Sequence, residues 1–369
     1  MMVSDFDYDL PSELIAQSPV SPRDHARLVV VDRKNNRLAH RRFFDIIEYF
    51  KKGDVLILND STVIPARLLG KKTSGGKVEI FLSKPFLDSS QDEKKERTGK
   101  KKARLKKGKA KNETWECLIK GKHIRPGSEV IFSPHFKAIV EEKIKEVWRV
   151  SFNMSGKKFR DALEKYGQTP LPPYIKAQSK STRKQYQTVY ADKTKNGSVA
   201  APTAGLHFTP GLLRKLKQKG VIIKTVTLHV GLGTFLPIRV TDPKKHRMHS
   251  EWVTVDKEVK KEIQDARKRN NKVFAVGTTT ARSLEAAFRE NKKADFFKKD
   301  FVDSVDIFLY PPYTFRAIDG LITNFHLPKS TLLMLVSAFA GRKEILRVYK
   351  EAVKEKYRFF SFGDAMLIM

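Results

Sequence analysis

The chain has 369 residues, with 73 Lys or Arg against 41 Asp or Glu, so its formal net charge is +32 at pH 7. Its hydrophobic fraction of 40% is high enough for a buried core and excludes a chain that is disordered by composition. The length favours about two domains. The charge predicts attraction to polyanions, and nucleic acid fits better than a membrane surface; a general solubility bias is the alternative.

Cys117 is the single cysteine, which excludes an intrachain disulfide framework and a Cys-based zinc site and fits a reducing compartment. The first residues are acidic and lack the apolar run of a secretory signal. The longest apolar run, residues 332–341, is too short to cross a bilayer. We therefore expect a soluble, cytoplasmic protein with no membrane partner.

The first half of the chain reads as strands. Residues 27–32 and 54–58 are β-branched runs, and short alternating apolar runs recur between residues 68 and 151. Their spacing is typical of a small β-barrel or sandwich. Inside this region, residues 88–112 hold eleven Lys or Arg against four Asp or Glu, with one large apolar residue. We expect a flexible loop there, either an RNA-contacting arm or a solvated insertion.

From residue 156 onward, helical and strand patterns alternate. Helices are predicted at residues 157–167, 209–220, 257–271, 279–291, 332–340 and 342–356, and strands at 221–231 and 272–277. This alternation predicts an α/β fold with a mostly parallel sheet. The simplest architecture is an α/β catalytic domain built from both chain ends, residues 1–61 and 153–369. A small β-barrel domain, residues 62–152, is inserted into it.

Two turns after predicted strands have ligand-binding chemistry. Gly277 permits a tight turn into a helix that begins with Thr278 and Thr279, and Arg282 can reach the same place. A helix start of this kind binds an anion or a carboxylate, although plain helix capping is the alternative. Gly231 and Gly233 would let a ligand approach the backbone. This pair alone is weak evidence for nucleotide binding, because a third glycine and an acidic partner are missing.

Residues 197–208 are rich in small side chains and end at His207. Small residues leave room for a planar ligand, to which His207 could donate or from which it could accept; a structural histidine is the alternative. Asn324 and His326 precede an apolar helix and form either a pocket wall or a helix cap. The terminal residues 357–367 combine aromatic side chains with charged ones, which stack on bases or form core.

Residues 246–252 contain His246, His249 and Glu251. The HxxH spacing suggests a metal, but a zinc enzyme needs a third ligand that is not evident. Glu251 is then either a proton acceptor or a surface carboxylate. No G-x-S-x-G elbow, P-loop or paired Cys/His nucleophile is present. The residues alone thus indicate a basic α/β protein with a small-molecule pocket and an RNA-facing surface.

Taken together, these segments resemble those of one family, the S-adenosylmethionine:tRNA ribosyltransferase-isomerases of queuosine biosynthesis. The resemblance runs essentially end to end and in the family's order. Two departures are the Lys-rich stretch 88–112, which looks inserted, and Pro312, where glycine is expected. The segments are DYDLPSELIAQSPVSPRDHARLVVVDR, NDSTVIPARL, GSVAAPTAGLHF, LHVGLGTFLPI, MHSEW, GTTTARSLEAA, TNFHLPKSTLLMLVSAF and YRFFSFGDAML.

The resemblance implies an α/β domain that carries a β-barrel domain. It implies transfer and isomerisation of the ribosyl part of S-adenosylmethionine onto 7-aminomethyl-7-deazaguanine at the tRNA wobble position. The products are epoxyqueuosine-tRNA, adenine and methionine. S-adenosylmethionine is a co-substrate, and no metal or prosthetic group is expected. The partner is the tRNA anticodon loop, and the protein is expected to be a monomer.

The matching motifs suggest a role for each candidate residue. His207 or His229 serves the adenine side or the proton transfer, and Glu251 or His249 assists. A protein base is dispensable if the substrate amine removes the proton next to the sulfonium. Thr278, Thr279 and Arg282 are expected to hold the methionine carboxylate at the helix start. Arg67 is expected to contact tRNA phosphates. The other residues expected to bind S-adenosylmethionine are Gly231, Gly233, Asn324 and His326.

Two rival functions stay open at this stage. A methyltransferase that uses S-adenosylmethionine on RNA would release S-adenosylhomocysteine, but its glycine-rich fingerprint is missing. A basic RNA-binding protein without enzyme activity would not need the threonine-rich turn at Gly277 or the small-residue segment before His207, and would release no adenine.

Overall fold

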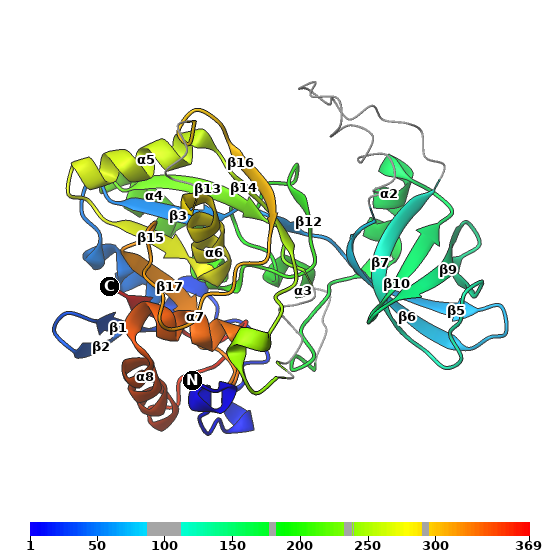
Figure 1. Ribbon diagram of the computed structural model, residues 1–369, viewed down its shortest axis with the longest axis horizontal. Helices are drawn as coiled ribbons and strands as arrows, with labels where there is room; N and C mark the ends of the chain where they lie inside the picture. The colour runs from blue at the N-terminus through cyan, green and yellow to red at the C-terminus, as the bar shows by residue number, and fades with distance from the viewer. Residues whose placement is uncertain (87–111, 177–181, 232–237, 239, 290–294) are drawn as a thin grey trace. The chain divides into compact units, whose positions relative to one another are not determined.

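The computed structural model describes residues 1–86, 112–176, 182–231, 238, 240–289 and 295–369. The chain divides into two compact units (Figure 1). Unit 1 consists of Met1–Val63 and Leu171–Met369, and unit 2 of Ile64–Pro170. Gly233 and nearly all of the predicted loop 88–112 lie outside the described residues.

In unit 1, the described strands form a nine-stranded sheet in the order β16-β14-β13-β3-β15-β17-β18-β1-β2. The neighbours β13, β3, β15 and β17 are parallel, and antiparallel pairs flank them. The predicted α/β class is thereby confirmed. The strands are β1 (Arg27–Asp32), β2 (Arg37–Arg42), β3 (Val55–Asn59), β13 (Ile222–Leu228), β14 (Glu251–Val255), β15 (Val273–Val276), β16 (Phe301–Val305), β17 (Gly320–Asn324) and β18 (Ala365–Ile368), and β4 (Thr62–Val63) pairs separately with β12 (Asn196–Ser198).

Both faces of this sheet are covered, which explains why β3 is buried along its whole length. Val55 and Ile57 belong to one core with α5, α6, α7 and α8, whereas Leu56 and Leu58 belong to a second core with α4 and the 3-10 helix η4 (Phe43–Tyr49). The helices are α3 (Thr182–Gln185), α4 (Pro210–Gln218), α5 (Lys257–Lys268), α6 (Gly277–Phe288), α7 (Thr331–Ala340) and α8 (Arg342–Lys354).

The helix boundaries follow the predicted signals. Thr209 caps α4 by accepting from the N–H of Leu212 at 3.1 Å, and Pro210 begins the helix. Gly220 follows with φ +87°, a conformation that favours glycine. Among the described residues, no helix is long and apolar enough to cross a membrane.

Unit 2 contains a closed six-stranded antiparallel barrel, because β5 pairs with both β6 and β8. The predicted inserted barrel is therefore confirmed. Alternate residues point inward, as the buried Val78, Ile80 and Leu82 of β6 show. The strands are β5 (Arg67–Lys72), β6 (Lys77–Pro85), β7 (Glu113–Lys120), β8 (Glu129–Ser133), β9 (Phe136–Ile144) and β10 (Val147–Phe152), and the short β11 (Gly167–Gln168) adds to β5.

Unit 2 extends to Pro170, beyond the predicted end of the barrel domain at residue 152. The reason is α2 (Gly156–Tyr166), whose Phe159 packs on Phe152 and Phe136 of the barrel with ring centroids 4.9 and 6.2 Å apart. The sequence pattern predicts residues 153–170 to belong to the α/β domain instead. The pattern indicates an apolar face on this helix, but it does not indicate which of the two hydrophobic cores that face packs against.

Candidate active site

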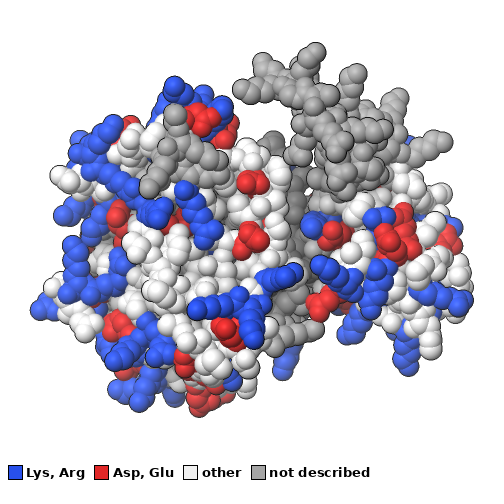
Figure 2. Space-filling view, viewed as in Figure 1, with Lys and Arg blue, Asp and Glu red and all other residues white. Residues whose placement is uncertain are grey.

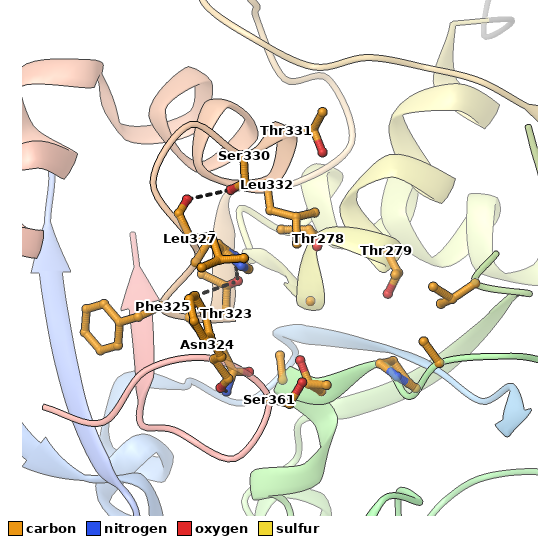
Figure 3. A pocket seen from close by; sticks show the side chains of 18 of the residues that line it. Thr278, Thr279, Thr323, Asn324, Phe325, Leu327, Ser330, Thr331, Leu332 and Ser361 are labelled. Carbon is orange, nitrogen blue, oxygen red and sulfur yellow. Dashed lines mark hydrogen bonds between the residues drawn. The ribbon is translucent and has the colours of Figure 1, made fainter. Parts of the chain in front are cut away.

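A cavity of about 410 Å³ lies in unit 1, where the parallel strands end. Val230 follows β13, Gly277 follows β15, and Asn324 ends β17, and all three line the cavity. In open α/β sheets, ligands bind outside the carboxyl ends of the parallel strands. Figure 3 shows Thr278, Thr279, Thr323, Asn324, Leu327, Ser330, Leu332 and Ser361 among the residues that line this space.

One wall is made of small residues, as the sequence predicted for segment 197–208. The cavity is lined by Ala200, Ala201, Pro202 and Ala204. Ala204 belongs to the short helix η6 (Thr203–His207). Small side chains leave open space beside the backbone, which suits a flat ligand. The wall is largely apolar, as is usual for small-molecule sites.

Tyr174 and Tyr186 also line the cavity, and sequence reasoning missed both. The hydroxyl groups of Tyr174 and Ser361 are 2.7 Å apart. Burial raises the pKa of Tyr174 to about 12, so this phenol stays protonated at neutral pH. Neither tyrosine lies in a periodic or glycine-rich segment, so no local signal marked them.

The N-terminus of α6 opens into the cavity through Gly277, Thr278 and Thr279. Gly277 has φ +87°, which allows the sharp turn from β15. No side chain caps this helix, and Thr280 instead donates to the carbonyl of Val276 at 2.7 Å. The threonines therefore do not act as caps. Thr279 Oγ1 is buried without a hydrogen-bond partner in the described part of the chain, so a ligand can satisfy it.

A second helix start, that of α7, faces the same cavity through Ser330, Thr331 and Leu332. Ser330 caps α7, since its hydroxyl accepts from the N–H of Leu333 at 3.1 Å and donates to the carbonyl of Leu327 at 2.8 Å. Two helix N-termini directed at one cavity make it favourable for a negative group.

Arg282 lies elsewhere than predicted. It is buried and forms an ion pair with Glu251, whose side chain is only 4% exposed, and neither residue lines the cavity. Arg282 Nε also donates to the carbonyl of Ile307 at 3.2 Å. The other oxygen of Glu251 accepts from the N–H of Gly231 at 3.0 Å. Arg282 is thus engaged away from the cavity, and Glu251 is neither a surface carboxylate nor a free base.

His207 is buried beside the cavity rather than in its lining. Its ring stacks on Phe43 at 4.9 Å, and its Nε2 lies 3.2 Å from Nδ2 of Asn324, which does line the cavity. Burial lowers the pKa of His207 to about 4, and the nearby Arg358 and Arg23 act in the same direction. The imidazole is therefore neutral at pH 7, and its contact with Asn324 links it to the cavity.

His326 lines the cavity, and its Nε2 is 2.8 Å from the Thr323 hydroxyl. Burial lowers the pKa of His326 to about 3, so it too is neutral. Its backbone N–H donates to the Tyr349 hydroxyl at 2.9 Å, which fixes the segment that follows β17.

The other two candidate histidines do not reach the cavity lining. His229 is held through its backbone N–H, which donates to Trp252 at 3.0 Å, and burial lowers the pKa of its ring. His249 is exposed on the segment before β14. Across the described residues, no three His, Cys, Asp or Glu side chains form a group that could hold a metal.

The comparisons with known proteins decide the family. A sequence profile described as queuosine biosynthesis protein matches residues 3–368. The chain belongs to this family. Its relatives include S-adenosylmethionine:tRNA ribosyltransferase-isomerases from Thermotoga petrophila, Thermotoga maritima and Geotalea uraniireducens, which are 48%, 47% and 46% identical and are matched over 100% of both chains. The predicted resemblance is confirmed, and the chain is an enzyme of this type that acts in queuosine biosynthesis.

A solved structure agrees with this family membership. The crystal structure of the S-adenosylmethionine tRNA ribosyltransferase from Thermotoga maritima superposes with a TM-score of 0.55. The match covers 99% of this chain and 100% of the other, with 38% identity over the superposed residues. Both units of this family member therefore have counterparts there.

The barrel of this queuosine biosynthesis protein has a groove of about 1130 Å³ that is rich in lysine. Arg67 lies outside it, and its Nε and Nη2 bind Glu79 at 2.8 and 3.1 Å, so its predicted phosphate contact stays a prediction. In the face of unit 1 shown in Figure 2, groups of Lys and Arg are spread among uncharged residues. The lysines that line the groove are Lys71, Lys72, Lys77, Lys120 and Lys122.

Proposed function

We propose that this enzyme transfers the ribosyl moiety of S-adenosylmethionine to 7-aminomethyl-7-deazaguanine at the tRNA wobble position and isomerises it. The products are epoxyqueuosine-tRNA, adenine and methionine. The names of its relatives include S-adenosylmethionine and tRNA. The observation that carries the proposal is the cavity of about 410 Å³ at the strand ends, where two helix N-termini and an unpaired amide oxygen meet a small-residue wall.

S-adenosylmethionine has chemical groups that suit each part of this cavity. Its carboxylate fits the N-terminus of α6, where the Thr279 hydroxyl and the backbone N–H groups of the first turn are available. Its purine fits against the wall of Ala200, Ala201 and Ala204. Arg282, which is bound to Glu251, takes no part in holding the carboxylate.

The proton next to the sulfonium must be removed before the ribosyl group can rearrange. No Asp or Glu side chain lines the described part of the cavity, and burial keeps His207 and His326 neutral. Glu251 is committed to Arg282 and Gly231. We therefore assign the base to the aminomethyl group of the tRNA substrate, which is consistent with the acidity that a sulfonium confers on its neighbouring C–H. Holding the two substrates together supplies much of the rate enhancement.

The lysine-lined groove of the barrel is proposed to bind tRNA phosphates. Lys71, Lys77, Lys120 and Lys122 are exposed, and the lone carboxylate among the groove's described residues, Glu79, is paired with Arg67. Phosphate contacts of this kind position RNA without reading its sequence.

Analysis of the small-molecule products tests the function. The enzyme is incubated with S-adenosylmethionine and tRNA that carries the deazaguanine precursor, and the products are separated by chromatography. The proposal predicts adenine and methionine in equal amounts. S-adenosylhomocysteine would instead indicate a methyltransferase and would contradict the proposal.

A further inference from the structure

Asn324 donates twice to acceptors of the protein. Its Nδ2 lies 2.9 Å from the carbonyl oxygen of Phe360 and 3.2 Å from Nε2 of His207. A carbonyl oxygen accepts but never donates, so Phe360 fixes which end of the amide is nitrogen. Since both Nδ2 hydrogens are engaged, Asn324 has no donor left for a ligand.

The contact also fixes the state of His207. Its Nε2 faces an N–H donor, so this nitrogen must be unprotonated and the neutral ring must hold its proton on Nδ1. The surroundings support the neutral form, because burial lowers the pKa of His207 to about 4 and Arg358 and Arg23 disfavour a cation. The stack on Phe43 holds the ring in place.

The remaining polar atom of the amide is Asn324 Oδ1. It is buried, and nothing in the described part of the chain donates to it. Asn324 is 2% exposed and lines the cavity. A buried acceptor without a partner is unfavourable, so a ligand group with an N–H or O–H donor gains affinity there, and a group that can only accept, such as a carbonyl oxygen, is disfavoured.

We propose that Asn324 Oδ1 accepts a hydrogen bond from an amino group of S-adenosylmethionine, and that His207 is a positioning residue that engages Asn324 Nδ2. This inference rests on the proposed function and names the group that the cavity recognises. S-adenosylmethionine has two amino groups, the exocyclic amine of adenine and the α-amine of the methionine part. Both are N–H donors, and the experiment distinguishes them.

Calorimetric binding provides the test. Dissociation constants are measured for S-adenosylmethionine, for S-inosylmethionine, which has an oxygen in place of the adenine amine, and for the analogue without the α-amine. The wild-type enzyme should prefer S-adenosylmethionine to one analogue by ~10- to 100-fold, the effect of one buried hydrogen bond. The Asn324→Leu variant should lose the preference over that one analogue and keep its relative affinity for the other analogue. If Asn324→Leu retains both preferences in full, Asn324 does not recognise an amine and the inference fails.

Two further measurements isolate the role of His207. His207→Leu should weaken the preference for S-adenosylmethionine over the analogue. His207→Gln should restore this preference, since a glutamine carbonyl can accept from Nδ2 of Asn324. Equal preferences in both variants would overturn the positioning role. In the folded wild-type enzyme, ¹⁵N NMR should show Nε2 unprotonated at pH 7, and a protonated Nε2 would overturn the assignment. Release of adenine by the wild-type enzyme tests the proposed function independently, because the binding measurements require no turnover.

Discussion

Glu251 and Arg282 form an ion pair whose side chains are 4% and 6% exposed, and the second oxygen of Glu251 accepts from the N–H of Gly231. Arg282 belongs to α6, Glu251 begins β14, and Gly231 follows β13. The ion pair thus links α6, whose N-terminus opens into the cavity, to the backbone at Gly231, which directly follows the cavity residue Val230. We assign it a structural role in holding the cavity wall.

The first prediction concerns this ion pair. Glu251→Leu leaves Arg282 buried with no opposite charge, which should lower the free energy of unfolding by about 3–5 kcal/mol. Glu251→Leu combined with Arg282→Met should recover most of this loss, because no charge is then left unpaired. Urea denaturation followed by circular dichroism measures both variants. A loss below about 1 kcal/mol for the single variant would show that Arg282 is solvated and that the pair is not structural.

The second prediction concerns pH. The pKa values of His207 and His326 fall to about 4 and about 3 in the folded protein, whereas the unfolded value is about 6.5. Between these values the unfolded chain binds more protons, so stability should decline as the pH is lowered from about 7 to about 4. The decline due to His207 should reach roughly 3 kcal/mol.

Unfolding measured from pH 7 to pH 4 tests this dependence. His207→Gln should show a flatter decline than the wild type, because it removes one of the two buried imidazoles. His249→Gln serves as a control for the substitution itself, since it replaces an exposed histidine. An identical slope in His207→Gln and the wild type would mean that His207 is already charged or solvated in the folded state.

The fold class and part of the sheet were predictable from local patterns, but no strand was predicted at β2, β14, β16, β17 or β18. The buried run of β3, the caps of α4 and the alternation of β6 each follow from residue periodicity and turn chemistry. The placement of α2 was not predictable, because its apolar face fits either core and its contacts with Phe152 and Phe136 are distant in sequence. Local patterns determine elements, and nonlocal packing determines to which unit an element belongs.

The third prediction concerns the start of α6. Thr279→Val removes a hydroxyl that has no partner among the described residues, and it should raise the Kd for S-adenosylmethionine by roughly 10- to 150-fold, the effect of one hydrogen bond to a charged group. Thr280→Val is the matched control in the same helix, because its hydroxyl is already bonded to Val276. Calorimetry compares the two variants. Equal affinities would remove the α6 start from carboxylate binding.

The fourth prediction concerns the groove of the barrel. Replacing Lys71, Lys77 and Lys120 by Gln should weaken tRNA binding and reduce the slope of log K against log salt by about 1 for each lysine that contacts a phosphate. Filter binding at several salt concentrations measures the slope. The control replaces three exposed lysines of α8, Lys343, Lys350 and Lys354. Equal slopes in the two triple variants would exclude the groove as the tRNA contact.

The candidate site was only partly predictable. The sequence indicated Thr278, Thr279, Asn324 and His326, because glycine turns, strand ends and polar clusters mark the edge of a parallel sheet. It misplaced Arg282, since a motif does not show that a carboxylate 31 residues away, Glu251, already binds the guanidinium. The relation of His207 to Asn324 joins residues 117 positions apart, and only the folded chain brings them together.

The central claim is that the cavity between α6 and the end of β17 binds S-adenosylmethionine. A crystal structure of the enzyme soaked with S-adenosylmethionine tests it most directly. The account predicts ligand density in this cavity, with the carboxylate at Thr279 and an amino group within hydrogen-bond distance of Asn324 Oδ1. Ligand bound at another place, with this cavity empty, would contradict it.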